Sequence, residues 1–138
     1  MRPSIFLDTN VVLDIVLERS EFLPEAREIL LLRDDEKVDL FTSALTVANS
    51  VYFARKFGKN HIETAKLLLR WFNIISLTSD QLENAALSRF KDFEDGLQYF
   101  AAREVKGLDY MVTRDASGFK ESQIPVVNPK EFLQILNS

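Results

Sequence analysis

The sequence predicts an α/β protein with three layers, in which helices cover both faces of a mostly parallel sheet of about five short strands. Two observations lead to this prediction. The apolar runs that would form strands are short and unbroken rather than alternating, which is typical of strands buried on both faces. Segments with a helical spacing of apolar residues separate these runs, and strands joined through helices usually pair in parallel.

The strands are expected where short apolar runs occur, at Ser4–Leu7, Val38–Phe41, Ile74–Leu77, Tyr110–Thr113 and Val126–Val127. In the first half of the chain, helical spacing predicts helices at Val11–Leu17, Glu21–Leu32, Leu45–Phe57 and His61–Phe72. Thr9 or Asn10 would cap the first of these helices, and Thr42 and Ser43 would cap the third, which Gly58 ends.

In the second half, Thr78 or Ser79 would cap a helix that runs to about Phe90. A further helix is expected from Asp92 to about Val105, where Gly107 stops it. The last helix, Lys130–Leu136, follows Pro129, and proline is favoured in the first turn of a helix.

Length and composition limit the class of protein. The 138 residues fit one domain, 1–138, and the absence of cysteine excludes disulfides and thiolate metal sites. A net charge of −4 argues against an extended basic nucleic-acid surface. The sequence shows neither a secretory signal nor an apolar run of the roughly 18 residues that span a membrane. A cytoplasmic protein is therefore expected.

Acidic residues lie at the ends of predicted strands and near the start of a predicted helix. Asp8 ends the first strand, and Asp115 follows the fourth strand after Thr113 and Arg114. Because the carboxyl ends of parallel strands share one edge of a sheet, where ligands bind, these acids should lie close together. Asp95, near the start of a helix, could reach the same edge.

Each acid also has a purely structural interpretation. Asp8 could belong to a turn, and Asp92 and Asp95 could serve as a helix cap and its partner. Asp115 could pair with Arg114 or Lys120. Taken together, however, the acids favour a cluster of hard oxygen ligands, which suits Mg²⁺ or Mn²⁺. The single histidine, His61, is better explained as a cap or surface residue, and no Ser-His-Asp arrangement can be built.

The chain resembles the PIN-domain family of metal-dependent nucleases over nearly its whole length. The resemblance lies in the segments Asp8-Thr9-Asn10, Leu13-Asp14-Ile15-Val16-Leu17-Glu18-Arg19, Glu94-Asp95-Gly96-Leu97, Thr113-Arg114-Asp115 and Ile124–Leu133. It implies metal binding by Asp8, Asp95 and Asp115 and cleavage of RNA with Mg²⁺ or Mn²⁺. Small bacterial members are commonly VapC-type toxins that an antitoxin neutralises, and members are often homodimers.

One position departs from the family pattern. The family usually has a fourth acid on the helix after the second strand, and the matching residue here is Asn49. Glu94 would compensate for the missing charge. Asn10 and Thr113 would orient the carboxylates or a metal-bound water, and Arg19 and Arg114 would meet substrate phosphates.

Two alternatives stay open at this stage. Asn49 and the acidic net charge also fit a PIN-like interaction module that has weak or no activity. A phosphatase with Asp8 as an aspartyl nucleophile ranks lower, because that chemistry commonly has a second acid two residues later, where this chain has Asn10.

Overall fold

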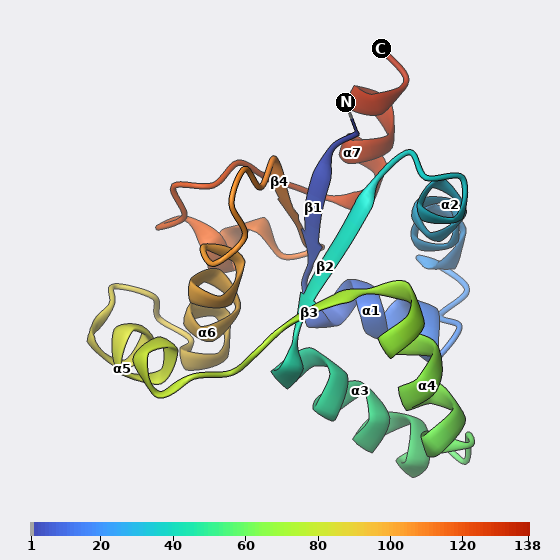
Figure 1. Ribbon diagram of the computed structural model, residues 1–138, viewed down its shortest axis with the longest axis horizontal. Coiled ribbons are helices and arrows are strands. Elements are labelled where there is room, and N and C mark those ends of the chain that lie inside the picture. The colour runs from blue at the N-terminus through green and yellow to red at the C-terminus, as the bar shows by residue number, and fades with distance from the viewer. Residues whose placement is uncertain (1) are drawn as a thin grey trace.

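In the computed structural model, residues 2–138 are described, and a five-stranded parallel sheet forms the centre of the molecule (Figure 1). The strands are β1 (Ser4–Leu7), β2 (Asp39–Ser43), β3 (Asn73–Ile75), β4 (Tyr110–Val112) and β5 (Val126–Val127). Their order across the sheet is β3-β2-β1-β4-β5, with every pair parallel. The predicted α/β class and parallel sheet are confirmed.

Seven α-helices and one short 3₁₀ helix are present among these residues. They are α1 (Thr9–Val16), α2 (Leu23–Asp34), α3 (Ala44–Lys56), α4 (His61–Trp71), α5 (Ser79–Leu87), α6 (Phe93–Ala102), the 3₁₀ helix η1 (Ala116–Phe119) and α7 (Pro129–Leu136). The sequence pattern did not reveal η1, which follows β4 directly.

Several predicted boundaries differ from the observed ones, and helix caps explain the most important case. The prediction that Thr9 or Asn10 caps the first helix is wrong, because Asp8 itself is the cap and its carboxylate accepts a hydrogen bond from the Thr9 amide at 2.8 Å. The helix therefore begins at once after the strand. Ser43 and Thr78 do cap α3 and α5, and α6 ends at Ala102, three residues earlier than expected.

Alternate residues of the central strand β1 contribute to two separate cores. Ile5 and Leu7 are fully buried in a core under α1, α2 and α7, whereas Phe6 is fully buried in a core on the α6 side. The second core includes Tyr99 and Phe119. Helices thus cover both faces of the sheet (Figure 1).

The register between β1 and β4 brings two chain segments together at the carboxyl edge. Leu7 lies opposite Val112, and the Asp8 amide still donates a hydrogen bond to the Val112 carbonyl at 3.0 Å. The residues that follow the two strands are therefore neighbours. Within the described residues, no helix has both the length and the apolar character needed to cross a membrane.

Candidate metal centre

Asp8 is buried at the carboxyl end of β1, with only 6% of its surface exposed. One carboxylate oxygen accepts the hydrogen bond from the Thr9 amide, and the other accepts one from the Thr113 hydroxyl at 2.8 Å. Burial raises the pKa of Asp8 above its ordinary value, and these two hydrogen bonds partly oppose that rise. The negative form is thus costly to bury here unless a positive charge is close.

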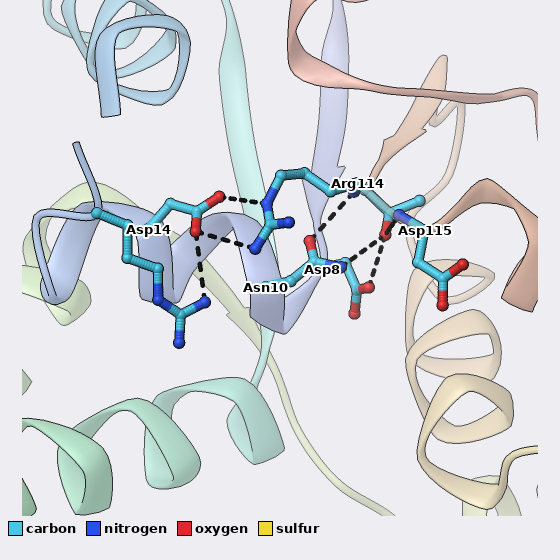
Figure 2. A network of polar contacts seen from close by, with 7 residues as sticks. Asp8, Asn10, Asp14, Arg114 and Asp115 are labelled. Carbon is cyan, nitrogen blue, oxygen red and sulfur yellow. Dashed lines mark hydrogen bonds and ion pairs between the residues drawn. The ribbon is translucent and has the colours of Figure 1, made fainter. Parts of the chain in front are cut away.

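Thr113 links the two strand ends. Its hydroxyl oxygen, which donates to Asp8, also accepts hydrogen bonds from the side-chain amide of Asn10 and from the backbone amide of Asp115, both at 3.1 Å. The Asn10 carbonyl oxygen in turn accepts a bond from the backbone amide of Arg114 at 3.2 Å. The hydroxyl of Ser117 donates to the Asp115 carboxylate at 2.7 Å. The Asp115 side chain is consequently held beside Asp8 (Figure 2).

Asp95 reaches the same edge from the first turn of α6, which Asp92 caps through a 2.9 Å bond to the Asp95 amide. Desolvation, and after it the nearby negative charges of Asp8, Asp92, Asp115 and Glu94, together raise the pKa of Asp95 to about 7. The raised pKa thus reflects burial of the carboxyl group first and the crowding of negative charge around it second.

Gly118 in η1 leaves room for the Asp95 carboxylate. A Cβ atom at this position would lie only 2.5 Å from Oδ2 of Asp95 and 3.4 Å from Oδ2 of Asp115. The two carboxylates therefore approach the same glycine from different segments of the chain.

The donor set suits a hard divalent cation. Three aspartates carry oxygen ligands of the kind that Mg²⁺ and Mn²⁺ prefer, and their mutual repulsion would fall on binding a cation. Within residues 2–138, however, no group of three or more His, Cys, Asp or Glu side chains already has an arrangement that could hold a metal ion. The carboxylates are neighbours at one edge, but they do not form a preassembled cage.

Asn49 lies on α3, where the family resemblance would place a further acid. Its side-chain amide donates a hydrogen bond to Oε1 of Glu94 at 3.1 Å. Glu94 precedes Asp95 in α6 and contributes to the negative field that Asp95 experiences. Asn49 occupies the position of the missing acid, and Glu94 is the acid expected to compensate for it. The two side chains are thus in direct contact beside the three aspartates.

Both arginines that the sequence assigned to substrate phosphates contact Asp14, a fully buried acid of α1. Arg114 makes two bonds to its carboxylate, at 2.7 and 3.1 Å, and Arg19 approaches it at 3.4 Å. The Arg114 guanidinium also lies 3.7 Å from the ring centre of Phe22. In Figure 2 the Arg114 side chain extends toward Asp14, away from the Asp115 carboxylate.

Sequence reasoning missed a buried polar network beneath the site, centred on Gln98 of α6. The Gln98 amide nitrogen donates to the hydroxyls of Thr9 and Thr46 at 2.6 and 2.5 Å, and its carbonyl oxygen accepts from Ser43 at 2.6 Å. This network ties α6, and with it Asp95, to the ends of β1 and β2. The sequence did hold a signal for this network, because Gln98 is the only amide side chain in the otherwise apolar and aromatic segment 97–102.

The PIN domain profile matches residues 4–117, and the chain belongs to the PIN domain family. The matched residues include Asp8, Asp95 and Asp115, so the acids described above lie within the part of the chain that the family model matches. The match covers most of the chain.

Among curated proteins, the chain is similar to Ribonuclease VapC1 of Aquifex aeolicus, with 30% identity over 143 residues that cover 97% of this chain and 96% of the relative. Among solved structures, it is similar to a toxin-antitoxin complex from Klebsiella pneumoniae, with a TM-score of 0.65, 24% identity, and coverage of 91% of this chain and 97% of the other. VapBC2 from Rickettsia felis, bound to a DNA fragment from its promoter, also has a TM-score of 0.65, at 16% identity, with 91% and 98% covered. The two structures support the fold.

Proposed function

We propose that this protein is a metal-dependent endoribonuclease that hydrolyses RNA phosphodiester bonds. The observation that carries the proposal is the meeting of Asp8, Asp95 and Asp115 at one sheet edge, with the pKa of Asp95 raised to about 7. The similarity to Ribonuclease VapC1 supports RNA as the substrate. The cation would be Mg²⁺ or Mn²⁺, held by these three aspartates.

A divalent cation would lower the pKa of a bound water and would offset negative charge on the scissile phosphate. The roles of this chain's residues follow from their contacts. The Thr113 hydroxyl holds Asp8 in one orientation, and Asn10 in turn fixes that hydroxyl. Asp115 is the most open of the three aspartates, so we place it on the side from which substrate and water arrive.

Asn49 and Glu94 act together in this proposal. The Asn49 amide bonds to one oxygen of Glu94 at 3.1 Å, which orients that carboxylate beside Asp95. Glu94 would then provide the negative charge that family members usually carry on the helix after the second strand. It could accept the proton of an attacking water, as a positioned carboxylate does in general base catalysis.

The test uses labelled single-stranded RNA, first with Mn²⁺ and then with excess chelator. Wild-type protein should cleave only with the metal, and Asp8→Asn should not cleave. Asn keeps the helix-capping ability of Asp, so the variant should retain its circular dichroism spectrum. Asp35→Asn, which changes an exposed acid at the end of α2, serves as the matched control and should cleave normally. Cleavage by Asp8→Asn at the wild-type rate would refute the assignment.

One observation favours the second candidate, a PIN-like interaction module with weak or no activity. Asn49 carries no charge, and loss of one negative ligand lowers affinity for a divalent cation. Failure of the wild-type protein to cleave any RNA with Mn²⁺, while it still binds a protein partner, would support this candidate. An aspartyl-phosphate trapped on Asp8 with a phosphate monoester would instead support the phosphatase alternative.

We further propose that the protein is the toxin of a toxin–antitoxin pair and forms a homodimer. The structural neighbours that are toxin–antitoxin complexes support a protein partner. Large apolar side chains also remain exposed, among them Tyr52 and Phe57 on and just after α3, which are 62% and 63% exposed. Sedimentation of the purified chain would test the dimer, since a monomer at all concentrations excludes it.

A further inference from the structure

We propose that a cavity beside Asp95 binds a nucleotide of single-stranded RNA next to the scissile phosphate. This inference rests on the proposed ribonuclease function and names a substrate subsite for it. The cavity has a volume of about 320 Å³ and lies between the segment before α6 and the segment around η1. A pocket of this size can accept a small ligand such as one nucleotide.

The cavity opens directly onto the candidate metal centre. Asp95 and Gly118 belong to its lining. Because Gly118 has no side chain, nothing at that position separates the cavity from the Asp95 carboxylate, which a Cβ atom would contact at 2.5 Å. A nucleotide in the cavity would therefore place its neighbouring phosphate close to the carboxylate cluster.

Three basic side chains line this cavity, together with the acids Asp92, Asp95 and Glu121. Arg89 and Lys91 come from the segment between α5 and α6, and Lys120 follows η1. All three are exposed, and none takes part in the ion pairs found within residues 2–138. They are available to a phosphate, which needs nearby positive charge to approach a group of carboxylates.

An aromatic ring is also part of the lining. Phe90 is half-buried, and its ring packs against Tyr99 and Phe119 with centroid distances of 5.0 and 6.1 Å. The ring is thus fixed in place by an aromatic cluster. Proteins that bind single strands combine such rings, on which bases stack, with basic groups along the backbone path. A base in a duplex is already stacked, so the cavity favours a single strand.

Binding can be measured without cleavage in the Asp8→Asn background. The probe is a fluorescein-labelled single-stranded RNA of mixed sequence, with Mg²⁺ present, and the readout is fluorescence anisotropy over a series of monovalent salt concentrations. The test variant is Lys91→Gln/Lys120→Gln. The matched control is Lys37→Gln/Lys106→Gln, which removes the same charge from exposed positions that precede β2 and β4 at the opposite edge of the sheet.

The test variant should bind about 25-fold more weakly at about 0.1 M salt, and its salt slope should fall by about 1.4, since each phosphate contact to a single strand contributes about 0.7. The control pair should bind as the parent does. Phe90→Leu keeps an apolar side chain but loses the flat ring, and its affinity should fall about tenfold with an unchanged salt slope. A circular dichroism spectrum checks that Phe90→Leu still folds. The lysine variants should fold like the parent, because both side chains are exposed.

The outcomes separate this inference from the function on which it rests. If wild-type protein cleaves RNA but the test and control pairs bind it with equal affinity and equal salt slope, the subsite is overturned and the ribonuclease stands. If wild-type protein does not cleave, yet RNA binding depends on Lys91 and Lys120, binding of single-stranded RNA in the cavity stands, and the ribonuclease falls together with the placement beside a scissile phosphate. Absence of both cleavage and lysine-dependent binding overturns the two together.

Discussion

Replacing Asp95 by asparagine should stabilise the metal-free protein, although it should abolish metal binding. Desolvation and four neighbouring carboxylates raise the pKa of Asp95 from 3.8 to about 7. The folded chain therefore holds this proton more tightly than the unfolded chain. Stability from this group is fully present below about pH 4 and is lost as the pH rises through about 7. Asparagine cannot ionise, so the variant escapes that loss.

The size of the effect follows from the same pKa change. A rise from 3.8 to about 7 sets an upper limit of about 4 kcal/mol, at about 1.4 kcal/mol per pH unit. Asp95 is partly exposed, so solvent screening reduces the expected gain at pH 8 to about 1–2 kcal/mol. Loss of an acid from the first turn of α6 offsets about 0.5 kcal/mol of this gain. The melting temperature should rise by about 3–6 °C.

Thermal unfolding with chelator, followed by circular dichroism at pH 5 and pH 8, measures this difference. Because pH 5 lies between the two pKa values, only part of this stability is lost there, so the variant's gain in melting temperature should be clearly smaller at pH 5 than at pH 8. Adding Mn²⁺ at pH 8 should stabilise only the wild type, because a ligand stabilises the state that binds it. Asp35→Asn should show no pH-dependent difference from the wild type.

Two results would refute the reasoning. A melting temperature of Asp95→Asn that is no higher than that of the wild type at pH 8 would mean that neither desolvation nor the neighbouring carboxylates disfavour the ionised form of Asp95. A gain of equal size at pH 5 and pH 8 would mean that the substitution acts through packing or capping and not through charge.

Three further predictions concern neighbouring positions. Gly118→Ala should lower Mn²⁺ affinity about tenfold, measured by calorimetry, because the new Cβ displaces the Asp95 carboxylate; unchanged affinity would show that this contact has no role in metal binding. Asn49→Glu should bind Mn²⁺ more tightly, since it adds a negative ligand beside Glu94, and equal or weaker affinity would place Asn49 outside the metal's reach. Asp14→Asn should destabilise the fold by about 3 kcal/mol in urea unfolding, because it leaves two arginines without their buried acid; a loss below about 1 kcal/mol would contradict this.

Part of the site could be predicted from the sequence because the carboxyl ends of parallel strands all lie at the same edge of the sheet. An apolar run that stops at an acid places that acid at the carboxyl edge, and this reasoning applied to both Asp8 and Asp115. Ser43 and Thr78 could be recognised as caps because a cap depends on residues within one turn.

Contacts across the sheet could not be read in the same way. Gln98 meets Thr9, Thr46 and Ser43 only after α6 packs beside the ends of β1 and β2, and no local pattern encodes that distance. Gly118 likewise becomes important only because η1 lies against Asp95.

The sequence by itself determined the succession of strands and helices along the chain, the parallel sheet, and the acids that follow two strands. These features depend on periodicity and on neighbours within a few residues. Only the tertiary structure decided that Arg114 turns to Asp14, that Asn49 holds Glu94, and that the cavity with Lys91 opens beside Asp95. The reason is physical: a side chain's partner depends on which segments are packed together, and that packing results from the burial of the whole chain.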